Sequence, residues 1–199
     1  VLKKVETDFL NEKNELTTRL NQIVEYVMGD TPINLNSQDD MTKVVYSRRV
    51  INKHDHKLTF NIGTNEAGKA LRPPHMTPKQ FNTAVRATTT IVYKTDAVSC
   101  CDCTGVGTIQ KFKTVTKIKL GKKYKVSADP YKNRTKCKTC SGLGAIYQPN
   151  GRVAGLKMVP ESAFDAAMGG FKTDKETIKR LIAKAEAKDN DYAVEFLTK

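Results

Sequence analysis

Four cysteines stand in two matched pairs along the chain. The stretches CCDCTGVG at 100–107 and CKTCSGLG at 137–144 each hold a C-x-x-C pair followed by x-Gly-x-Gly, and we call each stretch a knuckle. A gap of two residues lets both thiolates of one knuckle reach the same ion, and two knuckles complete a tetrahedral sphere. The glycines allow turns that point N–H groups at sulfur. We predict a structural Zn²⁺ site made of Cys100, Cys103, Cys137 and Cys140.

Disulfides or redox-active thiols are the alternative to zinc in these knuckles. Stable disulfides are rare in the reducing interior of a cell, and thioredoxin-like chemistry uses one C-x-x-C at the start of a helix. Both considerations favour a zinc site that is closed to substrate. Cys101 is left over, and we interpret it as inert, although its place next to Cys100 also makes it an alternative ligand.

No catalytic centre is evident in the sequence. Neither a nucleophile with its base nor a pair of carboxylates stands out, so we assign no catalytic residue. His54 and His56 alternate as residues on one strand face do, and together they would be able to hold an ion, but no third ligand lies nearby. We interpret them as solvated loop histidines, and the chain as a binding module.

Positive charge is concentrated in the middle of the chain. The formal net charge is +13 with a pI near 9.5, which indicates a polyanionic partner, with nucleic acid before a membrane surface. Between Val98 and Pro160, thirteen Lys or Arg against two Asp leave a net charge of +11. We expect this basic segment to contact DNA phosphates. Its predicted contact residues are Lys113, Lys117, Lys119, Lys122 and Lys123.

Two helices are expected before the basic segment. Apolar residues recur at three- and four-residue spacing from Leu2 to Val27, which predicts a long amphipathic helix that ends at Gly29. A second helix is expected after Ser37, whose hydroxyl can cap it while Asp39 and Asp40 occupy the first turn. Met41, Val44 and Val45 would be the buried residues of this second helix.

Strands and then helices are expected in the rest of the chain. Residues 57–62 alternate like a strand, and residues 88–93 are β-branched and extended. Residues 109–120 and 124–126 predict a basic β-hairpin between the knuckles. Thr173 with Glu176 matches a capping box that would open a helix, and a further helix is expected from about Tyr192. The predicted fold is α+β, with long helices flanking an inserted, basic, β-rich, zinc-ribbon-like module.

The flanking helices resemble the thumb subdomain of family A DNA polymerases, the bacterial DNA polymerase I family. The resemblance lies in the helix FLNEKNELTTRLNQIVEYVMG, in the following segment INLNS at 33–37, and in the short helix carrying Met41, Val44 and Tyr46. The stretch FKTDKETIKRLIAKAEAKDNDYAVEFLTK is similar to the helix that carries the thumb back toward the palm. Thumb-like segments would then occupy residues 1–49 and 170–199, and residues 50–169 would be the inserted module.

The resemblance implies a DNA-binding role for residues at two helix starts. Family thumbs lie along the minor groove of primer–template duplex and hold its phosphates, a kind of contact that positions DNA without reading sequence. Carried over by position, the implied contacts are Asn34, Asn36, Ser37, Lys172 and Thr173. The chain departs from the family at Gln38-Asp39-Asp40, which puts the individual phosphate contacts in question.

The resemblance also implies the partners of the chain. Phage-type members carry thumb insertions, some of which recruit a processivity protein, and the knuckles would belong to such an insertion. The chain begins at Val1 and stops at Lys199 within a helix-like pattern, so we expect a segment of a longer nucleotidyltransferase. Palm carboxylates and finger-helix cations are missing from it, so the segment alone would not polymerise DNA.

Two other functions are compatible with the same features. A free-standing zinc-knuckle protein would bind RNA or single-stranded nucleic acid through the basic hairpin, with Phe112, Tyr124 and Tyr131 stacking on bases. The knuckles also resemble the zinc domain of DnaJ-type chaperones, but that domain has four copies of the motif and this chain has two. The sequence lacks an apolar run long enough for a bilayer, so we expect a cytoplasmic protein, in the host cytoplasm if phage-encoded.

Overall fold

The structure is a computed structural model that describes residues 2–60, 73–120, 122–130, 134–166 and 170–198. Helices are combined with small antiparallel sheets, in agreement with the α+β prediction. The chain divides into two compact units, which are described separately below. We call residues 1–95 with 149–199 the helical unit, and residues 96–148 the cysteine unit. The cysteine unit is shorter than the predicted insertion of 50–169, because the rest of that segment belongs to the helical unit.

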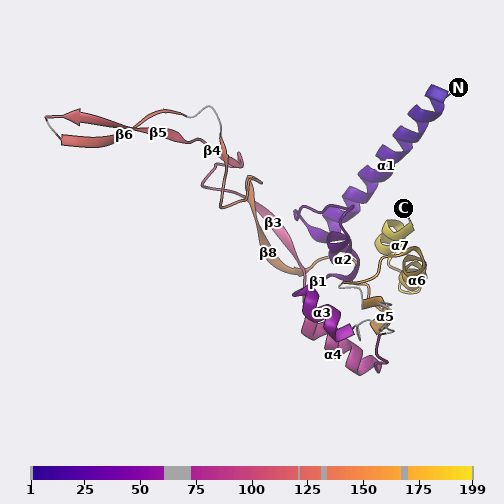
Figure 1. Cartoon of the computed structure of the whole chain (residues 1–199). Helices are drawn as coiled ribbons and strands as arrows, with labels where there is room; N and C mark the ends of the chain where they lie inside the picture. The colour runs from indigo at the N-terminus through magenta and orange to yellow at the C-terminus, as the bar shows by residue number, and fades with distance from the viewer. Residues whose placement is uncertain (1, 61–72, 121, 131–133, 167–169, 199) are drawn as a thin grey trace, which may run out of the picture. The chain divides into compact units, whose positions relative to one another are not determined.

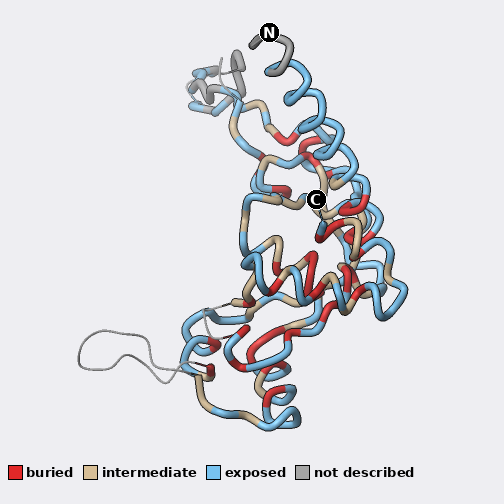
Figure 2. Tube along the Cα trace, turned by 90° about the vertical axis from the view of Figure 1, so that its right-hand side faces the viewer, coloured by how far each residue is buried: buried red, intermediate tan, exposed pale blue. Residues whose placement is uncertain are grey.

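The first helix is confirmed, but only its last turns are buried. Helix α1 (Leu2–Met28) ends at Gly29, whose φ of +71° suits glycine, and a Cβ there would lie 2.6 Å from the Thr95 carbonyl oxygen. Ile23, Val27 and Met28 are buried, whereas Phe9 is 65% exposed. Figure 2 shows the early turns of α1 in pale blue and the buried residues only near its end. The apolar stripe predicted along the whole helix therefore packs at one end alone.

The second helix begins where the capping residues predicted it. In α2 (Gln38–Tyr46), the Ser37 side chain accepts a hydrogen bond from the Asp40 N–H, and two aspartates occupy the first turn. Val44 and Val45 are fully buried and Met41 is partly buried. The short strand β1 (Arg48–Val50) follows and pairs antiparallel with β2 (Thr89–Ile91).

The strand predicted from Lys57 is wrong as far as the described residues reach. Residues Lys53–Phe60 form helix α3, and residues 61 and 62 lie outside the described part. The alternation that suggested a strand is short, whereas His56 and Phe60, one helical turn apart, both turn toward the core. Helix α4 (Pro78–Thr88) follows, opened by a capping box between Thr77 and Gln80.

The helices at the end of the chain are confirmed with one correction. The predicted helices are α6 (Lys175–Glu186) and α7 (Asp191–Thr198), and a short helix before them, α5 (Ala163–Ala166), was not predicted. The cap of α6 is Asp174 and not Thr173, because the Asp174 carboxylate accepts the Thr177 N–H at 2.9 Å. This shift by one residue removes Glu176 from the position that a capping box requires.

Helix α7 packs back against α1 within the helical unit. The Arg19 guanidinium donates to the Glu195 carboxylate at 2.5 Å and 3.0 Å, and the rings of Tyr26 and Tyr192 stack with centroids 4.5 Å apart. Two segments at opposite ends of the sequence thus lie side by side, as Figure 1 shows. Within the described part of the chain, none of the helices has both the length and the apolar character that crossing a bilayer requires.

An aromatic cluster forms the centre of the helical core. Tyr46 packs on Phe171 at 4.9 Å between ring centroids, and Phe60 packs edge-on against Phe81 at 5.9 Å. The Tyr46 hydroxyl donates to the Lys172 carbonyl at 2.6 Å, and burial raises the pKa of this phenol. A buried polar ring is thereby satisfied while its apolar body fills the core.

Small two-stranded sheets build the cysteine unit and its connections. The pairs are β3 (Tyr93–Ser99) with β8 (Ala145–Val153), β4 (Thr108–Ile109) with β7 (Thr135–Lys136), and β5 (Phe112–Lys119) with β6 (Lys122–Pro130). The last pair is the predicted basic hairpin, which lies between the two knuckles in the sequence and is drawn in Figure 1 as the extended pair beyond β4. Its turn residue Gly121 lies outside the described residues.

Candidate metal centre

The four predicted cysteines come together as one buried cluster. Their sulfur atoms all lie within 4.8 Å of one another, with 3.8 Å between Cys100 and Cys137 and 3.6 Å between Cys103 and Cys140. The edge of a tetrahedron with metal–sulfur bonds of about 2.3 Å is about 3.8 Å. All five cysteines are free thiols, so the disulfide alternative is not seen. The cluster is placed to hold a metal ion, and an all-cysteine donor set suits zinc.

The two knuckles hold each other through reciprocal backbone contacts. The Cys100 N–H donates to the Gly144 carbonyl at 2.8 Å, and the Cys137 N–H donates to the Gly107 carbonyl at 2.9 Å. Within each knuckle, the last glycine donates its N–H to the second cysteine sulfur, at 3.2 Å in both cases. The two knuckles therefore make equivalent hydrogen bonds to each other, and each supplies a carbonyl acceptor for the first metal-site cysteine of the other.

The last glycine of each knuckle is required by both conformation and space. Gly107 has a φ of +76° and Gly144 a φ of +81°, in the left-handed region. A Cβ on Gly107 would lie 2.3 Å from the Gly142 carbonyl oxygen, and one on Gly144 would lie 2.3 Å from the Gly105 carbonyl oxygen. Any side chain at these positions would push the two knuckles apart.

Burial and N–H donors act in opposite directions on the cluster thiols. Burial raises the pKa of the Cys100 thiol to about 12. Burial also acts to raise the pKa of Cys140, but the Gly144 N–H and neighbouring groups outweigh it and lower that pKa to about 7. The proton is therefore held more firmly on Cys100 than on Cys140, and a bound cation would displace thiol protons.

Cys101 stands outside the cluster. Its side chain is exposed, and its thiol faces the Asp102 carboxylate with 3.6 Å between sulfur and oxygen. The other Asp102 oxygen accepts a hydrogen bond from the Thr139 hydroxyl of the second knuckle. Asp102 therefore adds a side-chain link between the knuckles, while Cys101 takes no part among the gathered thiols.

The predicted phosphate contacts before α2 lie in an ordered loop. The Asn34 side-chain oxygen accepts the Asn36 N–H at 3.0 Å, and the Asn34 N–H donates to the Asp40 carboxylate at 3.1 Å. Asn34 and Asn36 are exposed, and Ser37 is half-buried as the cap of α2. The loop presents exposed amide groups, but the oxygen of Asn34 and the carboxylate of Asp40 are used to hold its shape.

The predicted contacts before α6 are less accessible. The Lys172 side chain is 18% exposed, and its ammonium lies 3.3 Å from the ring centroid of Phe164 and 4.0 Å from the Asp174 carboxylate. Thr173 is half-buried and does not cap the helix. The charge of Lys172 is therefore engaged within the helical unit.

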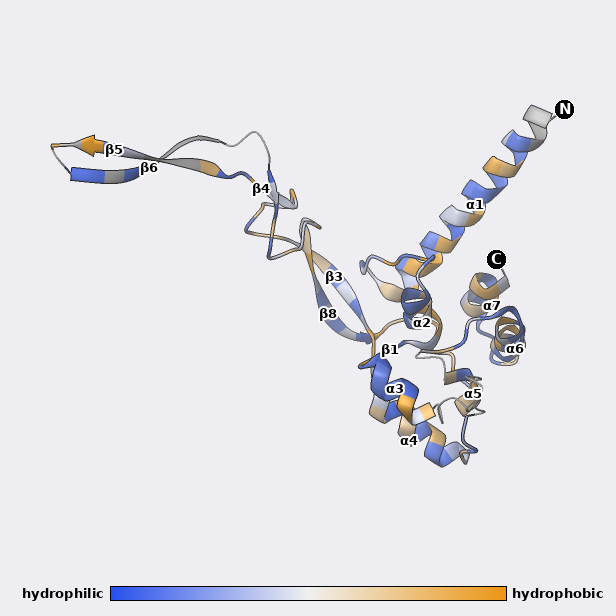
Figure 3. Cartoon of the chain, viewed as in Figure 1, coloured by the Kyte–Doolittle hydropathy of each residue, from blue (hydrophilic) through white to orange (hydrophobic). Residues whose placement is uncertain are grey.

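The hairpin lysines are more accessible to a bound anion than Lys172 is. Lys117, Lys122 and Lys123 are exposed, while the side chains of Lys113 and Lys119 lie outside the described set. In the register, Lys117 pairs with Tyr124 and Lys119 pairs with Lys122. Figure 3 shows hydrophilic colour along the start of β6. Leu120, next to the turn, is 94% exposed.

One histidine differs from the prediction. His54 is exposed as expected, but His56 is fully buried, because it lies on the inner face of α3. Its Nδ1 lies 2.9 Å from the Thr88 hydroxyl, which donates to the Ala84 carbonyl and therefore accepts from the ring N–H. Burial lowers the pKa of His56. The signal in the sequence was its spacing of four from Phe60.

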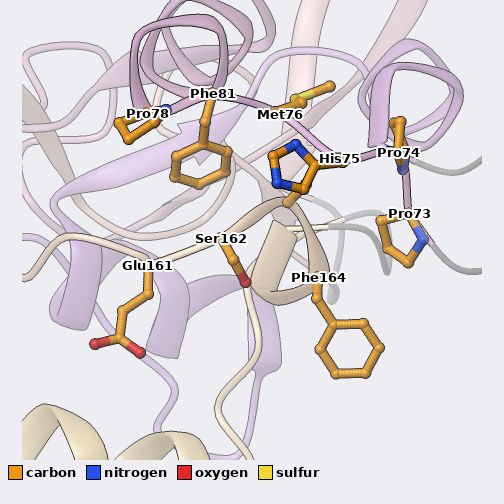
Figure 4. A pocket seen from close by; sticks show the side chains of 10 residues that line it. Pro73, Pro74, His75, Met76, Pro78, Phe81, Glu161, Ser162 and Phe164 are labelled. Carbon is orange, nitrogen blue, oxygen red and sulfur yellow. The ribbon is translucent and has the colours of Figure 1, made fainter.

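A hollow of about 470 Å³ in the helical unit was not foreseen from the sequence. Figure 4 shows His75, Met76 and Phe81 on one side of it and Glu161 and Ser162 on the other. Hydrogen bonding to Lys184, together with Arg180, lowers the pKa of Glu161. Among the described residues, no hydrogen bond is found between His75 and Ser162, which both line this hollow.

Comparison of the chain with models of protein families, with curated proteins and with solved structures finds no match in any of the three.

Proposed function

We propose that this chain is a nucleic-acid-binding segment of a family A DNA polymerase, in which a zinc-stabilised module extends the grip on primer–template duplex. The observation that carries the proposal is the charge of the hairpin. Residues 111–127 contain seven lysines and no acidic residue, and every lysine side chain described there is exposed. Such a ribbon has nothing within it to neutralise its charge, which is the property expected of a polyanion-binding arm.

The proposed role of the metal follows from the position of the hairpin. A two-stranded hairpin is marginally stable alone in water. This one leaves the cluster directly after the first knuckle and returns directly before the second, through the short β4 and β7 pair. Zinc bound by the four cysteines would fix both ends of the basic arm without taking part in chemistry.

The proposed polymerase origin is supported by the packing of the flanking helices. The α2 cap lies at Ser37, at the end of the INLNS segment, and α7 returns to α1 through the pair of Arg19 with Glu195. This is the order of helix, motif and returning helix on which the resemblance rests. The implied partners are duplex DNA, the other polymerase domains and a processivity protein.

The test is fluorescence anisotropy of a labelled primer–template duplex titrated with the zinc-loaded chain across a salt series. We expect binding that weakens steeply with salt, and an equal-length single strand should compete poorly. Changing Lys117, Lys122 and Lys123 to Gln should reduce affinity by about tenfold or more. Absence of duplex binding at low salt would contradict the proposal and redirect the search to a protein partner of the hairpin.

A single-stranded partner is the second candidate. The Phe112 ring is 53% exposed at the start of the basic hairpin, where a base would be able to stack on it. The side chain of Tyr124 and the whole of Tyr131 lie outside the described set. Equal affinity for single strand and duplex, together with a loss of single-strand binding in Phe112→Ala, would favour this candidate over the polymerase segment.

A further inference from the structure

A basic groove lies in the helical unit, next to the Asn34–Ser37 loop but lined by residues that the sequence did not single out for DNA. Two adjoining cavities of about 310 Å³ and 170 Å³ share Asp39, Thr42, Lys53 and Gly170 in their walls. One wall is the start of α2, and the other is formed by β1 and α3. We call these adjoining cavities the basic groove, and the basic side chains of its walls are Lys43, Arg49, Lys53, His54 and Lys57.

The cations of the groove outnumber the carboxylates beside them. Lys53 pairs with Asp39 at 2.7 Å, and Lys43 pairs with Asp40 at 2.6 Å. Arg49 and Lys57 are exposed, and among the described residues no ion pair is present for either. Two positive charges in the groove are thus left without a described counter-ion, and they lie in a concave surface, where field lines concentrate.

The groove and the predicted phosphate loop meet at the same helix. Ser37 caps α2 and follows Asn36 of the loop, while Gln38 and Asp39 begin the helix and line the groove. Lys53 and Lys57 are one turn apart on α3, so both project from one side of that helix. An anion bound at the loop therefore has further cationic partners within the same unit.

We propose that the basic groove binds phosphates of the nucleic-acid backbone, which extends the contact surface from the Asn34–Ser37 loop onto α3. The inference rests on the proposed function, and it adds Arg49, Lys53 and Lys57 as contact residues. The backbone phosphates would be held by charge and hydrogen bonding without base recognition. Asp39 stays paired with Lys53, and its charge sets a limit on how deeply a phosphate enters.

The test compares two variants of equal charge. The groove variant carries Arg49→Gln, Lys53→Gln and Lys57→Gln, and the control variant carries Lys13→Gln, Lys179→Gln and Lys188→Gln at exposed positions outside the groove. Each lowers the formal net charge from +13 by three. Both are titrated with the same labelled duplex over a salt series, after circular dichroism has shown unchanged helical content.

The groove variant should bind about tenfold more weakly than the control, and the slope of log affinity against log salt should fall by about 2 to 3. A third variant, Lys53→Arg with Lys57→Arg, keeps the charge and should bind like the parent chain. If the groove and control variants bind alike while the parent chain binds duplex, the groove inference is overturned and the proposed function stands. If the parent chain itself does not bind duplex, the proposed function fails, and the groove as a nucleic-acid site fails with it.

Discussion

The helical unit and the cysteine unit are stabilised by different means. In the helical unit, a continuous apolar cluster surrounds Tyr46, Phe60 and Phe171, all fully or almost fully buried. Among the described residues of the cysteine unit, the buried cluster consists of the four cysteines, with the partly buried Ile146 packed against it. Burial of apolar area stabilises the first unit, whereas we expect the second unit, with its small apolar core, to depend on a bound metal ion. The same chain therefore has one part that should fold without an ion and one part that should not.

Metal removal should give the largest difference in stability between the two units. In zinc-finger peptides, the apparent binding free energy of structural zinc is about 10 to 16 kcal/mol, and it adds to the free energy of folding. Addition of a strong chelator should therefore remove hydrogen-exchange protection from residues 96–148 and leave the core of the helical unit protected. Cys103→Ser should have the same effect, and Cys101→Ser, outside the cluster, should have none. Retained protection in the cysteine unit after chelation would contradict this contrast.

A cavity in the aromatic core should destabilise the helical unit and leave the cysteine unit unchanged. Phe171 is fully buried against Tyr46 and His56, so Phe171→Ala should lower the free energy of unfolding of the helical unit by about 3 to 5 kcal/mol. Zinc affinity, measured by competition with a chromogenic chelator, should not change. The exposed Phe9→Ala is the matched control and should change stability little. A weaker zinc affinity in Phe171→Ala would show that the units are coupled.

Alanine substitutions at two glycines of one knuckle should distinguish the effect of backbone conformation from that of close packing between the knuckles. Gly107→Ala brings both an unfavourable φ and a clash with a carbonyl oxygen, so it should weaken zinc binding by about 3 kcal/mol or more. Gly105→Ala has a similar φ of +82°, but its Cβ would meet only the Ser99 hydroxyl at 3.9 Å. Gly105→Ala should therefore weaken zinc binding by only about 1 to 2 kcal/mol. Equal losses in the two variants would show that the close approach of the knuckles is unimportant.

The corrected cap of α6 should produce a smaller effect. Asp174→Ala removes the acceptor of the Thr177 N–H and should lower the free energy of unfolding by about 1 kcal/mol, as measured by urea denaturation. Thr173→Ala should have a smaller effect, because Thr173 does not cap the helix. The reverse ranking would restore the capping box that the sequence had predicted.

Mild acid should lower the stability of the helical unit by the smallest amount. Burial lowers the pKa of His56 below its ordinary value of 6.5, so the unfolded chain binds the proton more readily. The free energy of unfolding is therefore fully retained above that value and falls as the pH drops below it, by less than about 1 kcal/mol between about pH 7 and 6. His56→Phe should lose this dependence. An unchanged pH profile in the variant would exclude His56 as its source.

Features that depend on neighbouring residues were the ones that could be predicted from the sequence. The C-x-x-C spacing predicted each knuckle, and Ser37 with two aspartates predicted the start of α2, because each is decided within a few residues. The repetition of the knuckle then predicted that the two pairs share one cluster. The hairpin was predicted for the same reason, since its two strands are separated by a short turn.

Features formed by distant segments could not be predicted in this way. The basic groove needs α2 and α3 side by side, and the hollow beside His75 needs residues from two parts of the chain. The pattern at 57–62 predicted a strand because a short alternating run fits either period, and packing of His56 and Phe60 decided for a helix. The polymerase resemblance stays a prediction that the DNA-binding test addresses.

The reciprocal bonds between the knuckles have a consequence for how the chain can change over evolution. Because the Cys137 N–H bonds to the Gly107 carbonyl, the segment between them is a closed loop whose ends are fixed by the knuckles themselves. The entropy of closing a loop grows only with the logarithm of its length, so doubling this segment would cost only about 0.6 kcal/mol. We therefore expect the segment between the knuckles to tolerate changes in length and charge while the four-cysteine centre stays the same.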